Sequence, residues 1–166
     1  MEKANMKVRE IAILDFGSQY THLIARRVRE LGIVSHIYPN DVKATELTNA
    51  VGIILSGGPK STLGEDALAY DRSLFDLGVP ILGLCYGHQL MAKHLGGIVS
   101  KGVAREYGLA TLQLKDTRYK FQDTNIFLKI PVETTVWMSH GDQVEKLPDG
   151  FVQIATTGND SIAAMA

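Results

Sequence analysis

The sequence predicts an α/β fold in which a mostly parallel sheet is covered by helices on both faces. Three observations support this class. Strand-forming runs alternate with helical patterns through the first half of the chain. These runs are apolar throughout, as in strands that are buried on both faces. In the second half, alternating strand patterns linked by polar loops indicate some antiparallel pairing. The 166 residues suggest one domain, 1–166, long enough to bury a sizeable core.

The first half gives a regular series of expected elements. An apolar run at 11–14 is typical of a buried strand, and the turn at 15–18 offers Ser18 as the N-cap of a helix. Apolar side chains then recur at helical spacing from Tyr20, and we expect Gly32 to end this helix. The further elements expected here are a strand at 33–38, a short helix at 44–50, a strand at 52–55, a helix over about 67–77 and a strand that begins at Pro80.

The second half reads as mostly strand. We expect strands at 109–114, 134–138 and 151–155, with a turn at 148–150 before the last of them. The apolar segment at 160–166 is expected to be a strand cut off before its partner.

The working loops of a parallel sheet lie beyond the carboxyl ends of its strands. Three turns of the first half follow predicted strands directly, at 15–18, at 56–59 and around Cys85. We therefore expect these three turns to gather at one edge of the sheet.

Cys85 is the sequence's one cysteine, and it stands in the pattern Gly-x-Cys-x-Gly between a predicted strand and a predicted helix. Such a turn strains the middle residue, and side chains at Gly83 and Gly87 would collide. The helix N-terminus is expected to favour the thiolate. A buried structural cysteine is the alternative, but the two flanking glycines favour a nucleophile.

Two further stretches have chemical content. The turn Ser-Gly-Gly-Pro at 56–59 exposes backbone N–H groups, and the N–H of Gly58 could pair with that of Tyr86 to hold an oxyanion. An ordinary tight turn is the alternative, and the turn is too short to be a phosphate-binding P-loop. The cluster Ser-His-Gly-Asp at 139–142 follows a predicted strand, which suggests a binding loop or, alternatively, a capped helix start.

Composition excludes several classes. A net charge of −1 with 21% charged residues gives no indication of nucleic-acid or membrane-surface binding. A single cysteine excludes an internal disulfide framework and agrees with a reducing cytoplasm. We find neither a signal-peptide pattern nor an apolar stretch as long as a membrane span, and we expect a cytoplasmic protein without a metal site.

Together these motifs resemble a known family. The order Asp-Phe-Gly-Ser-Gln-Tyr at 15–20, Ser-Gly-Gly-Pro at 56–59, Gly-Leu-Cys-Tyr-Gly at 83–87 and Trp-Met-Ser-His-Gly-Asp at 137–142 is similar to the glutaminase domain of GMP synthetases. These domains belong to the class I, triad-type glutamine amidotransferases, and the bacterial single-chain form is the most similar. The resemblance implies a flavodoxin-like, doubly wound fold and covers nearly the whole chain from residue 11.

The resemblance also implies a mechanism. Cys85 attacks the side-chain amide of L-glutamine, ammonia leaves, and water hydrolyses the thioester. The implied roles of other residues are oxyanion donors at Gly58 and Tyr86 and substrate binding by Gly57, Gln89, Ser139, His140, Gly141 and Asp142. For His140, a loop position without substrate contact remains an alternative. No cofactor is implied in this domain. The ammonia would pass to an ATP-pyrophosphatase domain that uses ATP and Mg²⁺ to aminate XMP, and full-length relatives are expected to be homodimers.

The sequence departs from the family in one respect. A triad needs a histidine base and a glutamate, which the family supplies in a Phe-His-Pro-Glu stretch beyond the point where this sequence stops. The histidines present are His22, His36, His88, His94 and His140. Of these, only His140 is expected at a strand's carboxyl end. We therefore expect an amidotransferase domain that is incomplete at its C-terminus and turns glutamine over poorly. The alternatives are a non-catalytic subunit for docking or regulation, or another cysteine-elbow enzyme, such as a γ-glutamyl hydrolase or a DJ-1-like protein.

Overall fold

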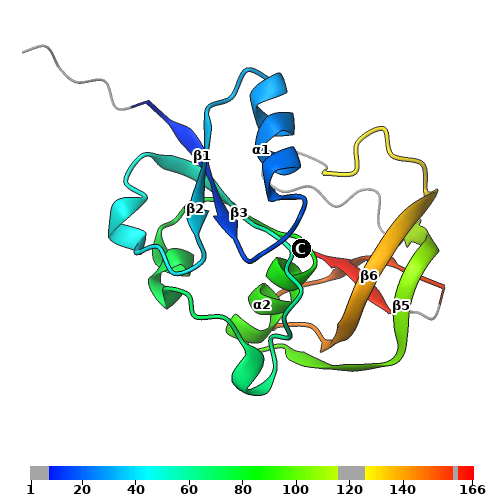
Figure 1. Cartoon of the computed structure of the whole chain (residues 1–166). Coiled ribbons are helices and arrows are strands. Elements are labelled where there is room, and N and C mark those ends of the chain that lie inside the picture. Colours follow the sequence, from blue (N-terminus) through cyan, green and yellow to red (C-terminus); the bar gives the residue numbers. More distant parts are fainter. Residues whose placement is uncertain (1–7, 116–125, 159–160) are drawn as a thin grey trace, which may run out of the picture. The chain divides into compact units, whose positions relative to one another are not determined.

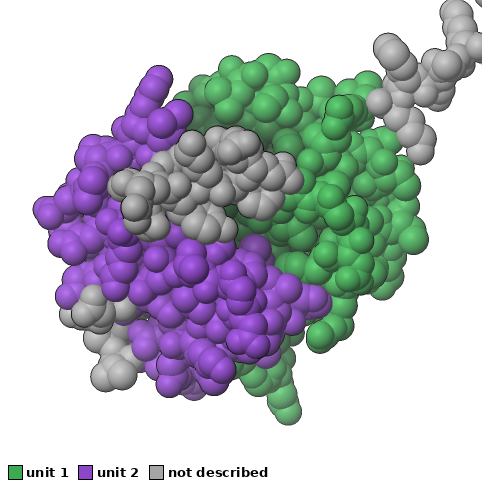
Figure 2. Space-filling view, turned by 180° about the vertical axis from the view of Figure 1, so that it is seen from behind, with its two compact units in different colours: residues 1–90 green, residues 91–166 purple. Residues whose placement is uncertain are grey.

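The computed structural model describes residues 8–115, 126–158 and 161–166. It divides into two compact units, residues 1–90 and 91–166, which Figure 2 shows in different colours. Each unit has its own sheet and is described by itself below. Within the described residues, no helix combines the length and the apolar character that crossing a membrane requires.

Unit 1 is built on a four-stranded parallel sheet (Figure 1). Its strands are β1 (Glu10–Asp15), β2 (Ser35–Pro39), β3 (Ala50–Leu55) and β4 (Ile81–Gly83), in the order β2-β1-β3-β4. The chain thus starts in the middle, adds β2 on one side and then β3 and β4 on the other, which is a doubly wound order. Ile13 and Leu14 in β1 are fully buried, as the apolar run predicts. The structure confirms the α/β class.

Helix α1 (Thr21–Glu30) lies beside β1 and β2 (Figure 1). It is tied to β2 where the Ser35 hydroxyl donates to the Ala25 carbonyl at 3.2 Å. Gly32 ends the helix with φ of +76°, as expected. The expected N-cap is wrong: Tyr20 occupies that position, while Ser18 accepts the Tyr20 N–H at 3.1 Å within the preceding turn.

The two other helices expected in unit 1 are replaced by short 3₁₀ turns. These are η1 (Ala44–Glu46), η2 (Gly64–Asp66) and η3 (Arg72–Asp76). Tertiary hydrogen bonds explain the difference. The Asp71 carboxylate accepts the N–H groups of both Ser73 and Ala44, so it caps η3 and η1 together. The Leu68 N–H donates to a tyrosine hydroxyl at 2.9 Å, which holds that residue outside any helix.

Unit 2 contains a four-stranded antiparallel sheet (Figure 1). Its strands are β5 (Ile98–Leu114), β6 (Glu133–Lys146), β7 (Gln153–Thr156) and β8 (Ile162–Met165), in the order β6-β5-β7-β8. The expected antiparallel pairing is confirmed. The expectation of an unpartnered last strand is wrong, because β8 pairs with β7; residue 160 lies outside the described residues.

Strand β6 also corrects the expected loop at 139–142. The strand continues through these residues to Lys146, and its partners in β5 include Glu106 opposite His140 and Lys101 opposite Asp142. The register shifts between these two pairs, so the regular pairing of β5 with β6 is interrupted around Gly141. An irregular ladder of this kind keeps the polar cluster inside a strand where sequence alone suggests a loop or a helix start.

Candidate active site

Cys85 lies at the sharp turn between β4 and helix α2 (Tyr86–His94). Its φ is +52°, in the left-handed region that L residues with a side chain seldom adopt. The Cys85 carbonyl accepts the Gln89 N–H at 3.1 Å, so the strained residue opens the helix. The residue as a whole is solvent-exposed, although the groups around it partly desolvate its thiol. This is the strand–turn–helix geometry of a nucleophile elbow, as the Gly-x-Cys-x-Gly pattern predicts.

The two glycines of the pattern are required by close backbone contacts. A Cβ on Gly83 would lie 2.5 Å from the Gly87 carbonyl oxygen, and a Cβ on Gly87 would lie 2.3 Å from the Leu55 carbonyl oxygen. Distances this short exclude any side chain at either position. The structure therefore confirms that side chains at these positions would collide. The one at Gly83 would meet the elbow itself, and the one at Gly87 would meet β3.

The turn after β3 lies against the cysteine. A Cβ on Gly57 would be 3.4 Å from the Cys85 Cβ, and the backbone N–H groups of Gly58 and Tyr86 both donate hydrogen bonds to Cys85. Gly58 allows no side chain because its Cβ would lie 2.3 Å from the Phe16 carbonyl oxygen. The structure thus brings together the two amides expected to form an oxyanion hole.

The third turn, after β1, completes the cluster. The Phe16 N–H donates to the Ser56 hydroxyl at 2.9 Å, and a Cβ on Gly17 would meet the Pro59 ring at 3.3 Å. The Asp15 carboxylate holds this turn by accepting the Gly17 N–H at 2.9 Å. The expectation that three turns gather at the carboxyl edge of the sheet is confirmed.

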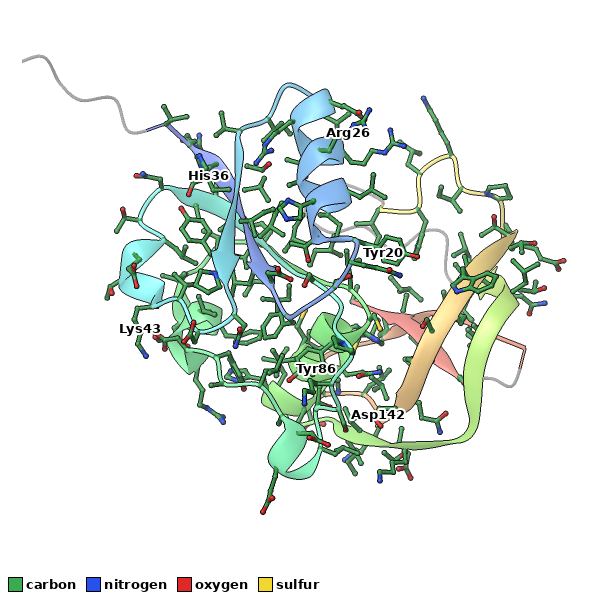
Figure 3. All side chains as sticks on the ribbon, in the orientation of Figure 1. Tyr20, Arg26, His36, Lys43, Tyr86 and Asp142 are labelled. Carbon is green, nitrogen blue, oxygen red and sulfur yellow. The ribbon has the colours of Figure 1, made fainter. Side chains whose placement is uncertain are left out.

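Two aromatic rings pack against each other where the turn after β1 meets the elbow. Phe16 and Tyr86 are 1% and 0% exposed, and their ring centroids lie 5.1 Å apart. Figure 3 labels Tyr86 on α2. Its hydroxyl accepts the Leu68 N–H. This packing fixes the first turn of α2 and therefore the direction of the Tyr86 N–H. Neither ring was identified from the sequence, where both look like ordinary core residues.

The thiol's ionisation differs from the expectation. Desolvation raises the pKa of Cys85 above the usual value for a thiol, and the hydrogen bonds from Tyr86 and Gly58 lower it without offsetting that increase. The helix N-terminus does act in the expected direction, through the Tyr86 N–H. It does not by itself make the resting sulfur a thiolate, because no cation is among the causes of the shift.

The other expected site residues are placed as follows. Gln89, in the first turn of α2, is 6% exposed. Ser139 and His140 lie in β6, and Asp142 in the same strand is 8% exposed (labelled in Figure 3). Their substrate contacts stay predictions, and His140 lies within its strand instead of at its carboxyl end. In the part of the chain that the structure describes, no group of three or more His, Cys, Asp or Glu side chains could hold a metal ion.

An open depression of about 410 Å³ lies elsewhere in unit 1. It is lined by residues at the end of α1 and the start of β2: Arg29, Gly32, Ile33, Val34, Ser35 and His36. These residues precede or begin a strand, so they belong to the amino-terminal edge of the parallel sheet, opposite to the edge that carries Cys85.

Fold and site together define an α/β protein with a cysteine nucleophile elbow faced by two backbone N–H donors. The family model described as glutamine amidotransferase class-I matches residues 12–166. The chain therefore belongs to the class-I glutamine amidotransferases.

Within this family, the chain is similar to curated GMP synthases. The chain is 51% identical over 158 residues to a GMP synthase (glutamine-hydrolyzing) of Geobacillus kaustophilus and 48% identical over the same length to that of Bacillus cytotoxicus. Each match covers 94% of this chain and 30% of the relative. The chain thus spans about a third of the length of the curated relatives it matches.

Two solved structures have a similar fold. A Thermoplasma acidophilum protein, proposed to be one subunit of a GMP synthase, superposes with a TM-score of 0.82 at 32% identity, over 96% of this chain and 78% of that one. A glutamine amidotransferase from Thermotoga maritima superposes with a TM-score of 0.74 at 22% identity, over 96% of this chain and 71% of that one. The second comparison supports the fold alone.

Proposed function

We propose that the chain is the glutaminase part of a GMP synthase and that Cys85 is its nucleophile. The observation that carries the proposal is the elbow: a solvent-exposed cysteine held at φ of +52° with the N–H groups of Gly58 and Tyr86 directed at it. A structural cysteine needs neither the strained backbone nor two convergent amides.

The proposed reaction is acyl transfer in two steps. The Cys85 sulfur forms a bond to the side-chain amide carbon of L-glutamine, the thiol proton moves to the amide nitrogen, and the C–N bond breaks to release ammonia. Water then attacks the γ-glutamyl thioester and releases glutamate and the thiol. In both steps the carbonyl oxygen becomes negatively charged, and the Gly58 and Tyr86 N–H groups stabilise that charge.

Substrate-binding roles are proposed for six further residues. In unit 1 these are Gly57, beside the cysteine, and Gln89, one turn along α2. In unit 2 they are Ser139, His140, Gly141 and Asp142 of β6, which would receive the α-amino and carboxylate groups of glutamine. The side-chain amide of glutamine is uncharged, whereas its other end carries an ammonium and a carboxylate, so recognition of the free amino acid requires polar groups besides the oxyanion donors.

The ammonia acceptor is proposed from the relatives. Their name, GMP synthase (glutamine-hydrolyzing), joins glutamine hydrolysis to GMP synthesis, and they are about three times as long as this chain. We propose that an ATP-pyrophosphatase region, which uses ATP and Mg²⁺, receives the ammonia and aminates XMP in the cytoplasm, and that the complete enzyme is a homodimer.

Turnover also needs a base. The family supplies this base and its glutamate in a Phe-His-Pro-Glu stretch that the 166 residues do not contain. We therefore propose that the 166-residue chain acylates slowly and releases little ammonia.

Labelling tests the proposal. The glutamine-analogue electrophile 6-diazo-5-oxo-L-norleucine should modify Cys85 in the intact chain, as measured by peptide mass spectrometry. L-Glutamine should protect the residue, and D-glutamine should not. Iodoacetamide, which needs no recognition, is the control for thiol access. Modification by iodoacetamide but not by the glutamine analogue would refute the proposal and favour a docking module or another cysteine-elbow enzyme.

A further inference from the structure

Ser56, the last residue before the paired glycines, makes four hydrogen bonds from a fully buried position. Its N–H donates to the Leu14 carbonyl at 3.1 Å, and its carbonyl accepts the Gly87 N–H at 3.1 Å. Its hydroxyl accepts the Phe16 N–H at 2.9 Å and donates to the Gly57 carbonyl at 2.8 Å. The side chain is 0% exposed, so water cannot replace these partners. Ser56 therefore connects β1, the turn after β3 and the first turn of α2.

The hydroxyl fixes the orientation of one peptide group. Because the Ser56 oxygen accepts the Phe16 N–H, its own proton is directed to the Gly57 carbonyl. That carbonyl and the Gly58 N–H belong to the same planar trans peptide, in which C=O and N–H point in opposite directions. With the carbonyl held toward Ser56, the Gly58 N–H points away from it. There it donates to Cys85.

The residues on either side of this peptide have no side chains that would restrict its rotation. The peptide is flanked by glycines on both sides, and glycine gives the backbone wide rotational freedom. A rotated peptide would present the Gly57 carbonyl oxygen to the sulfur and would repel both a thiolate and an oxyanion. The Ser56 hydroxyl favours the orientation in which the Gly58 N–H points at Cys85, because only in that orientation can it donate a hydrogen bond to the Gly57 carbonyl.

We propose that Ser56 is a positioning residue that sets the oxyanion hole by holding the Gly57–Gly58 peptide with its N–H directed at Cys85. Its catalytic purpose rests on the proposed glutaminase function. The orientation of the peptide can be tested independently of that function, because the reactivity of the chain's sole cysteine depends on the Gly58 N–H without any substrate.

The test is the pH dependence of Cys85 alkylation by iodoacetamide in the intact chain. Since the chain has one cysteine, the rate reports a single thiol. Ser56→Ala removes the hydroxyl and frees the peptide, so the thiolate loses one donor and the midpoint should move up by about 0.5 pH units or more. Ser56→Thr keeps the hydroxyl and should stay within about 0.2 units of the unsubstituted chain.

Ser35→Ala is the matched control. Ser35 is 2% exposed, and its hydroxyl also donates to a backbone carbonyl, that of Ala25. The same chemical change there should cost a similar amount of stability and leave the alkylation midpoint unchanged. An unchanged midpoint in folded Ser56→Ala, or an equal upward shift in Ser56→Thr or Ser35→Ala, would overturn the proposal.

A second measurement needs no variant to fold. In the unsubstituted chain, the amide proton resonance of Gly58 should titrate with the Cys85 thiol, whereas an amide that does not respond would overturn the proposal. Neither readout uses glutamine. If the pH effects are present and the glutamine analogue fails to label Cys85, the proposed function fails and the role of Ser56 in orienting the peptide stands.

Discussion

A Cβ on Gly87 would lie 2.3 Å from the carbonyl oxygen of Leu55, because the first turn of α2 meets the end of β3 at backbone contact distance. This contact sets how close the elbow comes to the turn after β3. It is also backed by a hydrogen bond between the two segments, in which the Leu84 N–H donates to the same Leu55 carbonyl at 2.9 Å. The spacing between Cys85 and the Gly58 N–H thus depends on the absence of one side chain.

Gly87→Ala should therefore damage both stability and the site. The added methyl can be accommodated only by moving α2 away from β3, and we expect a loss of about 3 kcal/mol in the free energy of unfolding. Labelling of Cys85 by the glutamine analogue should fall by at least about 10-fold, since one oxyanion donor is displaced. Gly158→Ala is the control, because a Cβ there meets nothing within 4 Å. Wild-type stability in Gly87→Ala, measured by urea unfolding, would contradict the contact.

Tyr86→Phe should separate the side chain of Tyr86 from its backbone. The hydroxyl accepts the Leu68 N–H at 2.9 Å, and its removal leaves that amide without this acceptor. We expect a loss of about 1 kcal/mol in urea unfolding. The N–H directed at Cys85 is unchanged, so alkylation of the cysteine should stay within about 2-fold. A large loss of thiol reactivity without a loss of stability would show that the hydroxyl acts on the site directly.

The pH dependence of Cys85 follows from the causes of its pKa shift. Burial raises the pKa of Cys85 more than the two amides lower it, so the midpoint of the alkylation rate against pH should lie above that of the same chain unfolded in urea. Because the folded pKa exceeds the unfolded one, the unfolded chain loses this proton first, and stability should fall as pH rises between the two values. A midpoint below that of the unfolded chain would indicate a cationic partner and contradict the raised pKa.

A second group with a shifted pKa is Tyr38, which lies in β2 of unit 1. Glu10 is 5% exposed and accepts the Tyr38 hydroxyl at 2.5 Å; His36 contacts the same carboxylate and is labelled in Figure 3. Burial and the Glu10 carboxylate raise the pKa of Tyr38 to about 12. In an ultraviolet titration some tyrosine absorbance should change only near that pH, and Glu10→Gln should lower the pKa of Tyr38. Since the unfolded tyrosine ionises first, this contribution to stability is lost as pH rises from about 10 to 12. Ionisation of all tyrosines together near their ordinary pKa would contradict the contact.

Local patterns predicted the elements whose cause is local. The apolar run of β1, the stop at Gly32 and the strained turn at Cys85 each depend on neighbours in sequence, and the structure has all three. The glycine pattern around Cys85 was informative because two close backbone contacts exclude every other residue type. The clustering of three turns followed from the topology of a parallel sheet.

The predictions that failed depend on distant partners. Asp71 caps Ala44 from 27 residues away, and Leu68 is held by the hydroxyl of Tyr86, so the segments around them form 3₁₀ turns in place of helices. The strand at 139–142 is decided by pairing with β5. Ser56 was missed because a serine before two glycines is common in turns, and its role depends on Phe16, 40 residues away.

We propose above all that Cys85 forms a thioester with the γ-carbonyl of glutamine. An activated substrate, the γ-p-nitrophenyl ester of L-glutamate, tests it most directly, because its leaving group departs as an anion and needs no proton from a general acid. Acid-quenched peptide mass spectrometry should then find a γ-glutamyl adduct on Cys85 that hydroxylamine removes, and Cys85→Ala should give none. A folded chain whose Cys85 reacts with iodoacetamide but acquires no γ-glutamyl group from this ester would contradict the claim.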